Sequence, residues 1–94
     1  MKEWERQEQR IAKQYGGRRQ PGSGSGWLHT NDVVDERYLH EAKQGAKMVT
    51  IKSEDWEKLR RNAMLMGREP LFHIQVGNRR LVLHDEGTPY DPPD

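Results

Sequence analysis

A change in the spacing of apolar residues along the chain is the feature that most constrains its fold. Over residues 2–15 the apolar side chains recur at spacings of four and three, as on one face of a helix. Residues 38–43 alternate instead, as in a strand, and residues 53–66 return to helical spacing. Helix and strand patterns mixed in one short chain predict a domain in which helices cover a sheet.

Turn and capping residues set the boundaries of these segments. Gly16-Gly17 ends the first predicted helix, and Ser53 offers an N-cap for the second, which Gly67 ends. The expected strands are, in chain order, 32–34, 38–43, 47–52, 71–76 and 80–84. We therefore predict an α/β fold, a mixed sheet flanked by helices. It forms one domain over residues 1–84, followed by an acidic, Pro-rich and disordered tail over 85–94.

The composition limits the classes to which the protein belongs. Only 32% of the 94 residues are hydrophobic, 33% are charged and the mean hydropathy is −1.16, so a single copy has little apolar material for a core. No cysteine is present, which excludes disulfides and Cys-ligated zinc, and the four histidines lack zinc-site spacing. No apolar run approaches the ~20 residues that span a bilayer, and no secretory signal follows Met1. We expect a cytoplasmic protein, in the host cell if a phage encodes it.

Charge is distributed unevenly along the chain. The last ten residues carry four carboxylates and no Lys or Arg. The overall net charge is +1, so residues 1–84 alone have a net charge of +5. A basic body with an acidic tail suits a polyanionic partner such as nucleic acid. The alternative is the ordinary mixing of charges on a surface.

One acidic residue stands out in the first predicted helix. Glu8 lies four residues after Trp4 and three before Ile11, which places it on the apolar face. A carboxylate buried there is unfavourable unless a partner compensates its charge. Glu8 therefore either has such a partner or lies at the edge of the stripe and reaches solvent.

Two carboxylates and a lysine come together if the strands 32–34 and 38–43 pair through their short turn. Glu41 and Lys43 are two residues apart and share a face, and Asp32 would then approach Glu41. Paired carboxylates favour Mg²⁺, for which Mn²⁺ substitutes, and the backbone carbonyl of Ala42 is a further candidate ligand. The alternative is a cross-strand ion pair between Glu41 and Lys43 on a solvated face.

A glycine-rich segment precedes the aspartate. Residues 18–26 read Arg-Arg-Gln-Pro-Gly-Ser-Gly-Ser-Gly, in which glycines allow the backbone to approach a phosphate closely. The segment lacks the Lys-Ser/Thr ending of a nucleotide-binding P-loop, so no nucleotide cofactor is expected. A flexible linker is the alternative.

This order of motifs resembles the PD-(D/E)XK nuclease superfamily, and within it the small Holliday junction resolvases of archaeal and phage type. The resemblance covers residues 5 to 84. The residues that carry it are Glu8, the segment 18–25, Asn31-Asp32-Val33-Val34 and Glu41-Ala42-Lys43-Gln44. It implies a restriction-endonuclease-like sheet and a homodimer. Met64 and Leu65, which broaden the apolar surface of the second predicted helix, are expected in the core or at the subunit interface.

The resemblance also implies roles for individual residues. Asp32 and Glu41 would bind the divalent metal, Lys43 would be catalytic, and Glu8 and Ser23 would assist near the scissile phosphate. Contacts to the DNA backbone are assigned to basic and loop residues: Arg18, Arg19, Ser23, Ser25 and Lys47.

The function expected from these features is metal-dependent cleavage of branched DNA. A dimer with two-fold symmetry would nick two opposed strands of a four-way junction and resolve it. One alternative is a nicking or restriction-type nuclease on linear DNA, and another is a non-catalytic DNA-binding module. Binding without cleavage would be strongly salt-dependent.

Overall fold

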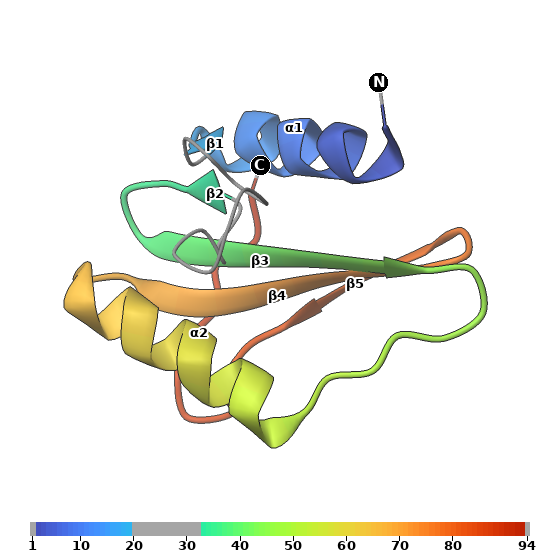
Figure 1. The fold of residues 1–94 in the computed structure, drawn as a ribbon. Coiled ribbons are helices and arrows are strands. Elements are labelled where there is room, and N and C mark those ends of the chain that lie inside the picture. The colour runs from blue at the N-terminus through green and yellow to red at the C-terminus, as the bar shows by residue number, and fades with distance from the viewer. Residues whose placement is uncertain (1, 20–32, 94) are drawn as a thin grey trace.

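The computed structural model describes residues 2–19 and 33–93. A five-stranded mixed sheet has α1 on one face and α2 on the other (Figure 1). The elements are, in chain order, α1 (Glu3–Tyr15), β1 (Arg18–Arg19), β2 (Val33–Val34), β3 (Tyr38–Gly45), α2 (Ser53–Leu65), β4 (Glu69–Val76) and β5 (Arg79–Leu83). The predicted α/β class is confirmed.

The strands lie in the sheet in their chain order. β1, β2 and β3 are successively antiparallel, β4 is parallel to β3, and β5 returns antiparallel to β4. A parallel neighbour requires a crossover, and α2 supplies it. β3 is therefore the central strand, and its pairing with β4 runs from Tyr38–Glu69 to Gly45–Val76.

Backbone capping explains where the two helices begin and end. The Glu5 side chain accepts the N–H of Lys2 at 3.2 Å, and α1 ends at Gly16, whose φ of 65° is in the left-handed region that glycine favours. α2 begins one residue earlier than predicted. Lys52 occupies the N-cap position in place of Ser53, and Asp55 accepts the Lys52 N–H at 2.9 Å.

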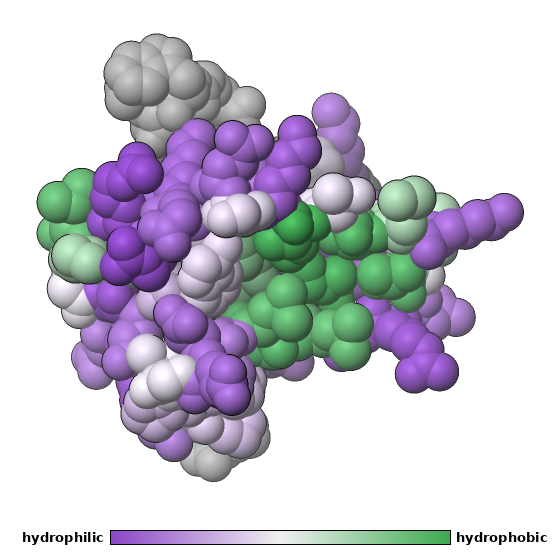
Figure 2. Space-filling view, turned by 90° about the horizontal axis from the view of Figure 1, so that it is seen from below, coloured by the Kyte–Doolittle hydropathy of each residue, from purple (hydrophilic) through white to green (hydrophobic). Residues whose placement is uncertain are grey.

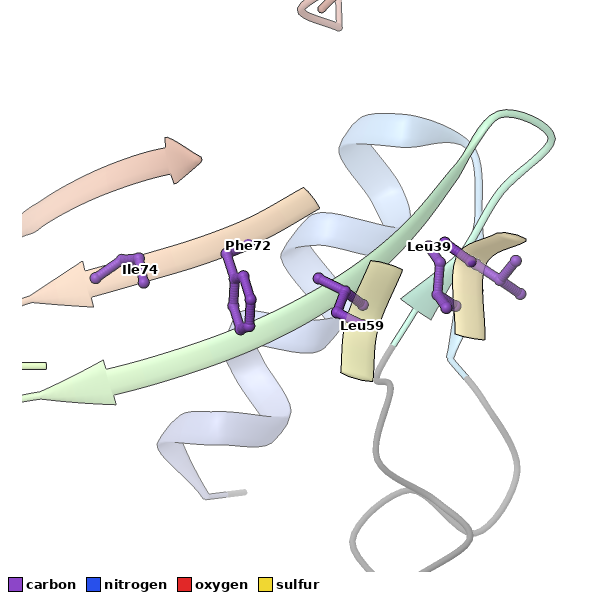
Figure 3. Packing of buried hydrophobic residues seen from close by; sticks show 6 residues of the cluster. Leu39, Leu59, Phe72 and Ile74 are labelled. Carbon is purple, nitrogen blue, oxygen red and sulfur yellow. The ribbon is translucent and has the colours of Figure 1, made fainter. Parts of the chain in front are cut away.

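The apolar core lies between the sheet and α2. Leu39, Phe72 and Ile74 project from β3 and β4 toward Leu59, and Figure 3 shows these four side chains together. Leu59 and Ala63 are the buried residues of α2, at 1% and 0% exposure. Met64 and Leu65, in contrast, are 63% and 82% exposed, so in the single chain they are not part of the core.

The predicted strand over residues 47–52 is wrong. The chain leaves the sheet after Gly45, where an added Cβ would collide with the backbone carbonyl of Met48, so it folds back sharply at this point. β4 pairs with β3 along its whole length, so residues 47–52 do not pair with β3 on that side. The alternation of Val49 and Ile51 instead reflects packing of the connection against the core.

The acidic tail, for which the sequence predicts disorder, has no helix or strand over residues 85–93 but contacts the body. The Tyr90 hydroxyl is 2.6 Å from the Tyr15 hydroxyl, and the Asp91 N–H donates to the Tyr38 hydroxyl at 3.1 Å. The Asp91 carboxylate also forms an ion pair with Arg37. Aromatic side chains thus tie the tail to the sheet next to the end of α1.

Candidate functional site

Glu41 and Lys43 lie on the face of β3 that α2 covers. The parallel register pairs them with Phe72 and Ile74, which belong to the core on that face. The Lys43 ammonium is 3.4 Å from an Asp55 carboxylate oxygen and 5.9 Å from the centre of the Phe72 ring. The expected common face of Glu41 and Lys43 is present, and the lysine is held at the start of α2.

Asp55 is a residue of this cluster that sequence reasoning missed. Its carboxylate accepts the Lys52 N–H and meets Lys43, and both side chains of the ion pair are about one-third exposed, at 29% for Lys43 and 31% for Asp55. The pKa of Asp55 is lowered, first by the hydrogen bond from Lys52 and then by Lys43. Its position in the first turn of a predicted helix was visible in the sequence. The fold that brings this turn to β3 was not.

Glu8 and Arg19 form a second polar cluster at the other end of the sheet. The Glu8 carboxylate is 2.9 Å from Nε of Arg19, and its side chain is 4% exposed against 34% for Arg19. The Arg19 guanidinium also lies 5.9 Å from the Trp4 ring. Of the two alternatives for Glu8, the structure has the buried, compensated one.

The two clusters lie on opposite faces of the sheet. α1, which carries Glu8, lies on one face of the sheet, and α2 lies on the other (Figure 1). Glu41 and Lys43 share the α2 face, because their register partners Phe72 and Ile74 belong to the core there. The β2–β3 ladder covers only Val33–His40 and Val34–Leu39. Within the described residues no strand pairs with β3 on this side beyond Val33, so the edge of β3 from Glu41 onward is where groups from both faces can meet.

The remaining predicted site residues have varied positions. Asp32, Ser23 and Ser25 lie outside the described residues. Arg18 is exposed in β1 opposite Val34, and Lys47 is exposed in the connection after β3. Ala42 pairs with His73 in the β3–β4 register.

The chemistry of the donor groups bears on whether a metal fits. Glu41 offers the hard oxygen ligands that Mg²⁺ prefers, and the second predicted carboxylate, Asp32, lies outside the described residues. Over 2–19 and 33–93 no three His, Asp or Glu side chains are grouped closely enough to hold a metal ion. The described part of the chain therefore contributes two of the expected ligands, the Glu41 carboxylate and the Ala42 backbone carbonyl, and Lys43 lies on the same face as Glu41.

A buried histidine pair under α1 was also missed. His40 Nδ1 is 2.8 Å from His73 Nε2, and His40 Nε2 is 2.6 Å from Asp35 Oδ2. Both rings are nearly inaccessible, at 0% and 7%, and Tyr15 packs on them at centroid distances of 4.6 and 5.4 Å. The sequence predicted only that His40 faces away from Glu41, which is confirmed.

Burial governs the protonation of this pair. It lowers the pKa of His73 to about 3, with smaller contributions from His40 and Arg10. It also lowers the pKa of His40, although Asp35 opposes the shift. Both imidazoles are therefore neutral near pH 7, and the network supports the fold under α1.

No family model, curated protein or solved structure matches this chain. No helix within the described residues is long and apolar enough to cross a membrane.

Proposed function

We propose that the protein is a Mg²⁺-dependent, structure-selective DNA endonuclease that resolves four-way junctions. The observation that carries the proposal is the presence of Glu41 and Lys43 on one face of the central strand, directly after β2. The mixed sheet with one helix on each face agrees with the architecture that the sequence resemblance implies.

The proposal requires Asp32 to continue the β2–β3 register by one residue. Val33 pairs with His40, so the next antiparallel pair would be Asp32 with Glu41. These two carboxylates would hold the metal, which when bound activates water and offsets charge on the phosphate. Lys43 would neutralise a non-bridging phosphate oxygen.

Glu8 and Arg19 support the proposal from the other face. A buried carboxylate compensated by an arginine beside β1 holds the chain where the glycine-rich segment begins. We propose that this pair positions the segment carrying Ser23 and Ser25 near the phosphate, with Arg18, Arg19 and Lys47 toward the DNA backbone. A homodimer would present two such sites to the two-fold arrangement of a junction.

Cleavage of a labelled four-way junction and a matched linear duplex, in Mg²⁺ and in EDTA, tests the proposal. We expect paired nicks on the junction that EDTA abolishes. Asp32→Asn and Lys43→Met should each reduce the rate by about a hundredfold or more. Lys58→Met removes an exposed lysine of α2 and is the matched control, with activity retained. Full activity of Asp32→Asn would contradict the metal site.

The second candidate function is a non-catalytic DNA-binding module. The internal ion pairs Lys43–Asp55 and Glu8–Arg19 favour it, because each could serve the fold alone. Salt-sensitive binding without cleavage in Mg²⁺ or Mn²⁺ would establish this function. Equal cleavage of linear and branched DNA would retain the nuclease and remove the junction selectivity.

A further inference from the structure

β5 is an edge strand with an uncovered apolar face. No described strand lies beyond it in the sheet order. Leu81 and Leu83 pair with Ile74 and Phe72, so they share the α2 face, yet they are 50% and 42% exposed. Figure 2 views the molecule from this side and shows a hydrophobic area bordered by hydrophilic residues. A strand edge with such a face is a template for another strand.

The backbone of β5 is suited to accept a partner. The two-residue turn Gly77-Asn78 makes Val76 and Arg79 the hydrogen-bonded pair that closes the hairpin. Along an antiparallel strand these groups alternate in direction, so Arg80 and Val82 point their N–H and C=O outward. The edge therefore offers regularly spaced donors and acceptors.

We propose that a second copy of this chain pairs with β5 in antiparallel register about a two-fold axis at Val82. This register places the outward groups of the two Val82 residues opposite one another. Leu81 of each copy then lies opposite Leu83 of the other, which joins the two apolar faces into one.

Charge complementarity favours a second copy of this chain as the source of the strand that pairs with β5. In the same register Arg79, at the start of β5, lies opposite Asp85 of the second copy, just past the end of its strand. Two-fold symmetry repeats this pair at the other end of the interface. A uniformly basic or acidic partner strand would match only one of the two ends. The other sheet edge offers less, because β1 is two residues long and its Arg19 already binds Glu8.

The interface does not depend on the nuclease proposal, because its test needs neither DNA nor metal. Sedimentation equilibrium of the full chain should give twice the chain mass of 11.1 kDa. Arg79→Asp and Asp85→Arg should each shift the protein toward monomer, and the two substitutions combined should restore the dimer. Arg61→Asp, an exposed arginine on α2, is the matched control and should leave the mass unchanged. A monomer at all concentrations, or a dimer indifferent to both reversals, would overturn the proposal.

The absence of cysteine allows the register itself to be measured. An oxidised mixture of Leu81→Cys and Leu83→Cys chains should form more disulfide-linked dimer than either variant alone, because opposed positions bring the two Cβ atoms within reach. Equal cross-linking in the mixture and in the separate variants would exclude a register centred on Val82. Both substitutions affect partly exposed side chains, so the fold of each chain should persist.

Discussion

At the residue scale, the two faces of the sheet are stabilised by different kinds of contact. The α2 face uses apolar contacts, whereas the α1 face buries Gln7, Glu8, His40 and His73. Each of these side chains makes at least one polar contact, although the Gln7 Oε1 atom has no hydrogen-bond partner among the described residues. The Gln7 amide donates to the carbonyls of Lys43 and His73, both at 3.3 Å, and so joins α1 to β3 and β4. Burial without such partners would be strongly destabilising.

The histidine pair should make stability depend on pH. The pKa of His73 is about 3 in the folded protein, below its ordinary value, so the unfolded chain binds more protons as the pH falls below about 6.5. Its stabilisation is complete above that pH and is lost on acidification, by up to about 1.4 kcal/mol per pH unit. Urea unfolding between pH 7 and 4.5 should show this decline.

A substitution isolates the contribution of His73. His73→Gln should reduce the slope of the pH dependence, because it removes one of the two buried imidazoles and leaves His40. The exposed His84 provides the matched control, and His84→Gln should retain the full slope. An unchanged slope in the His73 variant would assign the acid sensitivity to His40 or to the carboxylates.

At the element scale, α2 is held by a few side chains that point into the sheet. Leu59 is 1% exposed and packs with Leu39 and Phe72 (Figure 3). Leu59→Ala should lower the free energy of unfolding by about 2–5 kcal/mol, because it leaves a cavity. Leu65→Ala, at 82% exposure on the same helix, should change it by no more than about 0.5 kcal/mol. Urea titrations of the two variants measure the difference, and equal effects would contradict this packing.

Most of the helices and strands could be predicted from the sequence alone. The spacing of apolar residues and the turn residues predicted both helices and most strands, because these signals depend on residues close together in the chain. The strand prediction over 47–52 was wrong because Val49 and Ile51 alternate for packing against the core. The direct β3–β4 pairing, which keeps these residues from that side of β3, is a long-range contact. The sequence did not identify Asp55 as a partner of Lys43, because the contact between α2 and β3 depends on the tertiary fold.

At the scale of the whole molecule, the acidic tail lies against the basic body. The Tyr90 hydroxyl is hydrogen-bonded to the Tyr15 hydroxyl, and the Tyr90 ring stacks on the His84 ring with the centroids 5.3 Å apart. These contacts hold the tail against this end of the molecule. Asp91 then pairs with Arg37, whose side chain is 41% exposed. If the body binds a polyanion as proposed, the tail carboxylate and a phosphate compete for this arginine.

The competition predicts an asymmetry between two substitutions that each remove one negative charge. Asp91→Asn frees Arg37, whereas Glu86→Gln removes an exposed tail carboxylate for which the described residues show no ion pair, so both change the net charge from +1 to +2. Asp91→Asn should strengthen DNA binding more at low salt. One further phosphate contact should also steepen the dependence of log K on log salt by about 0.9. Screening should remove the difference at high salt. Binding curves for the two variants that coincide at every salt concentration would show that the tail does not cover the DNA-binding surface.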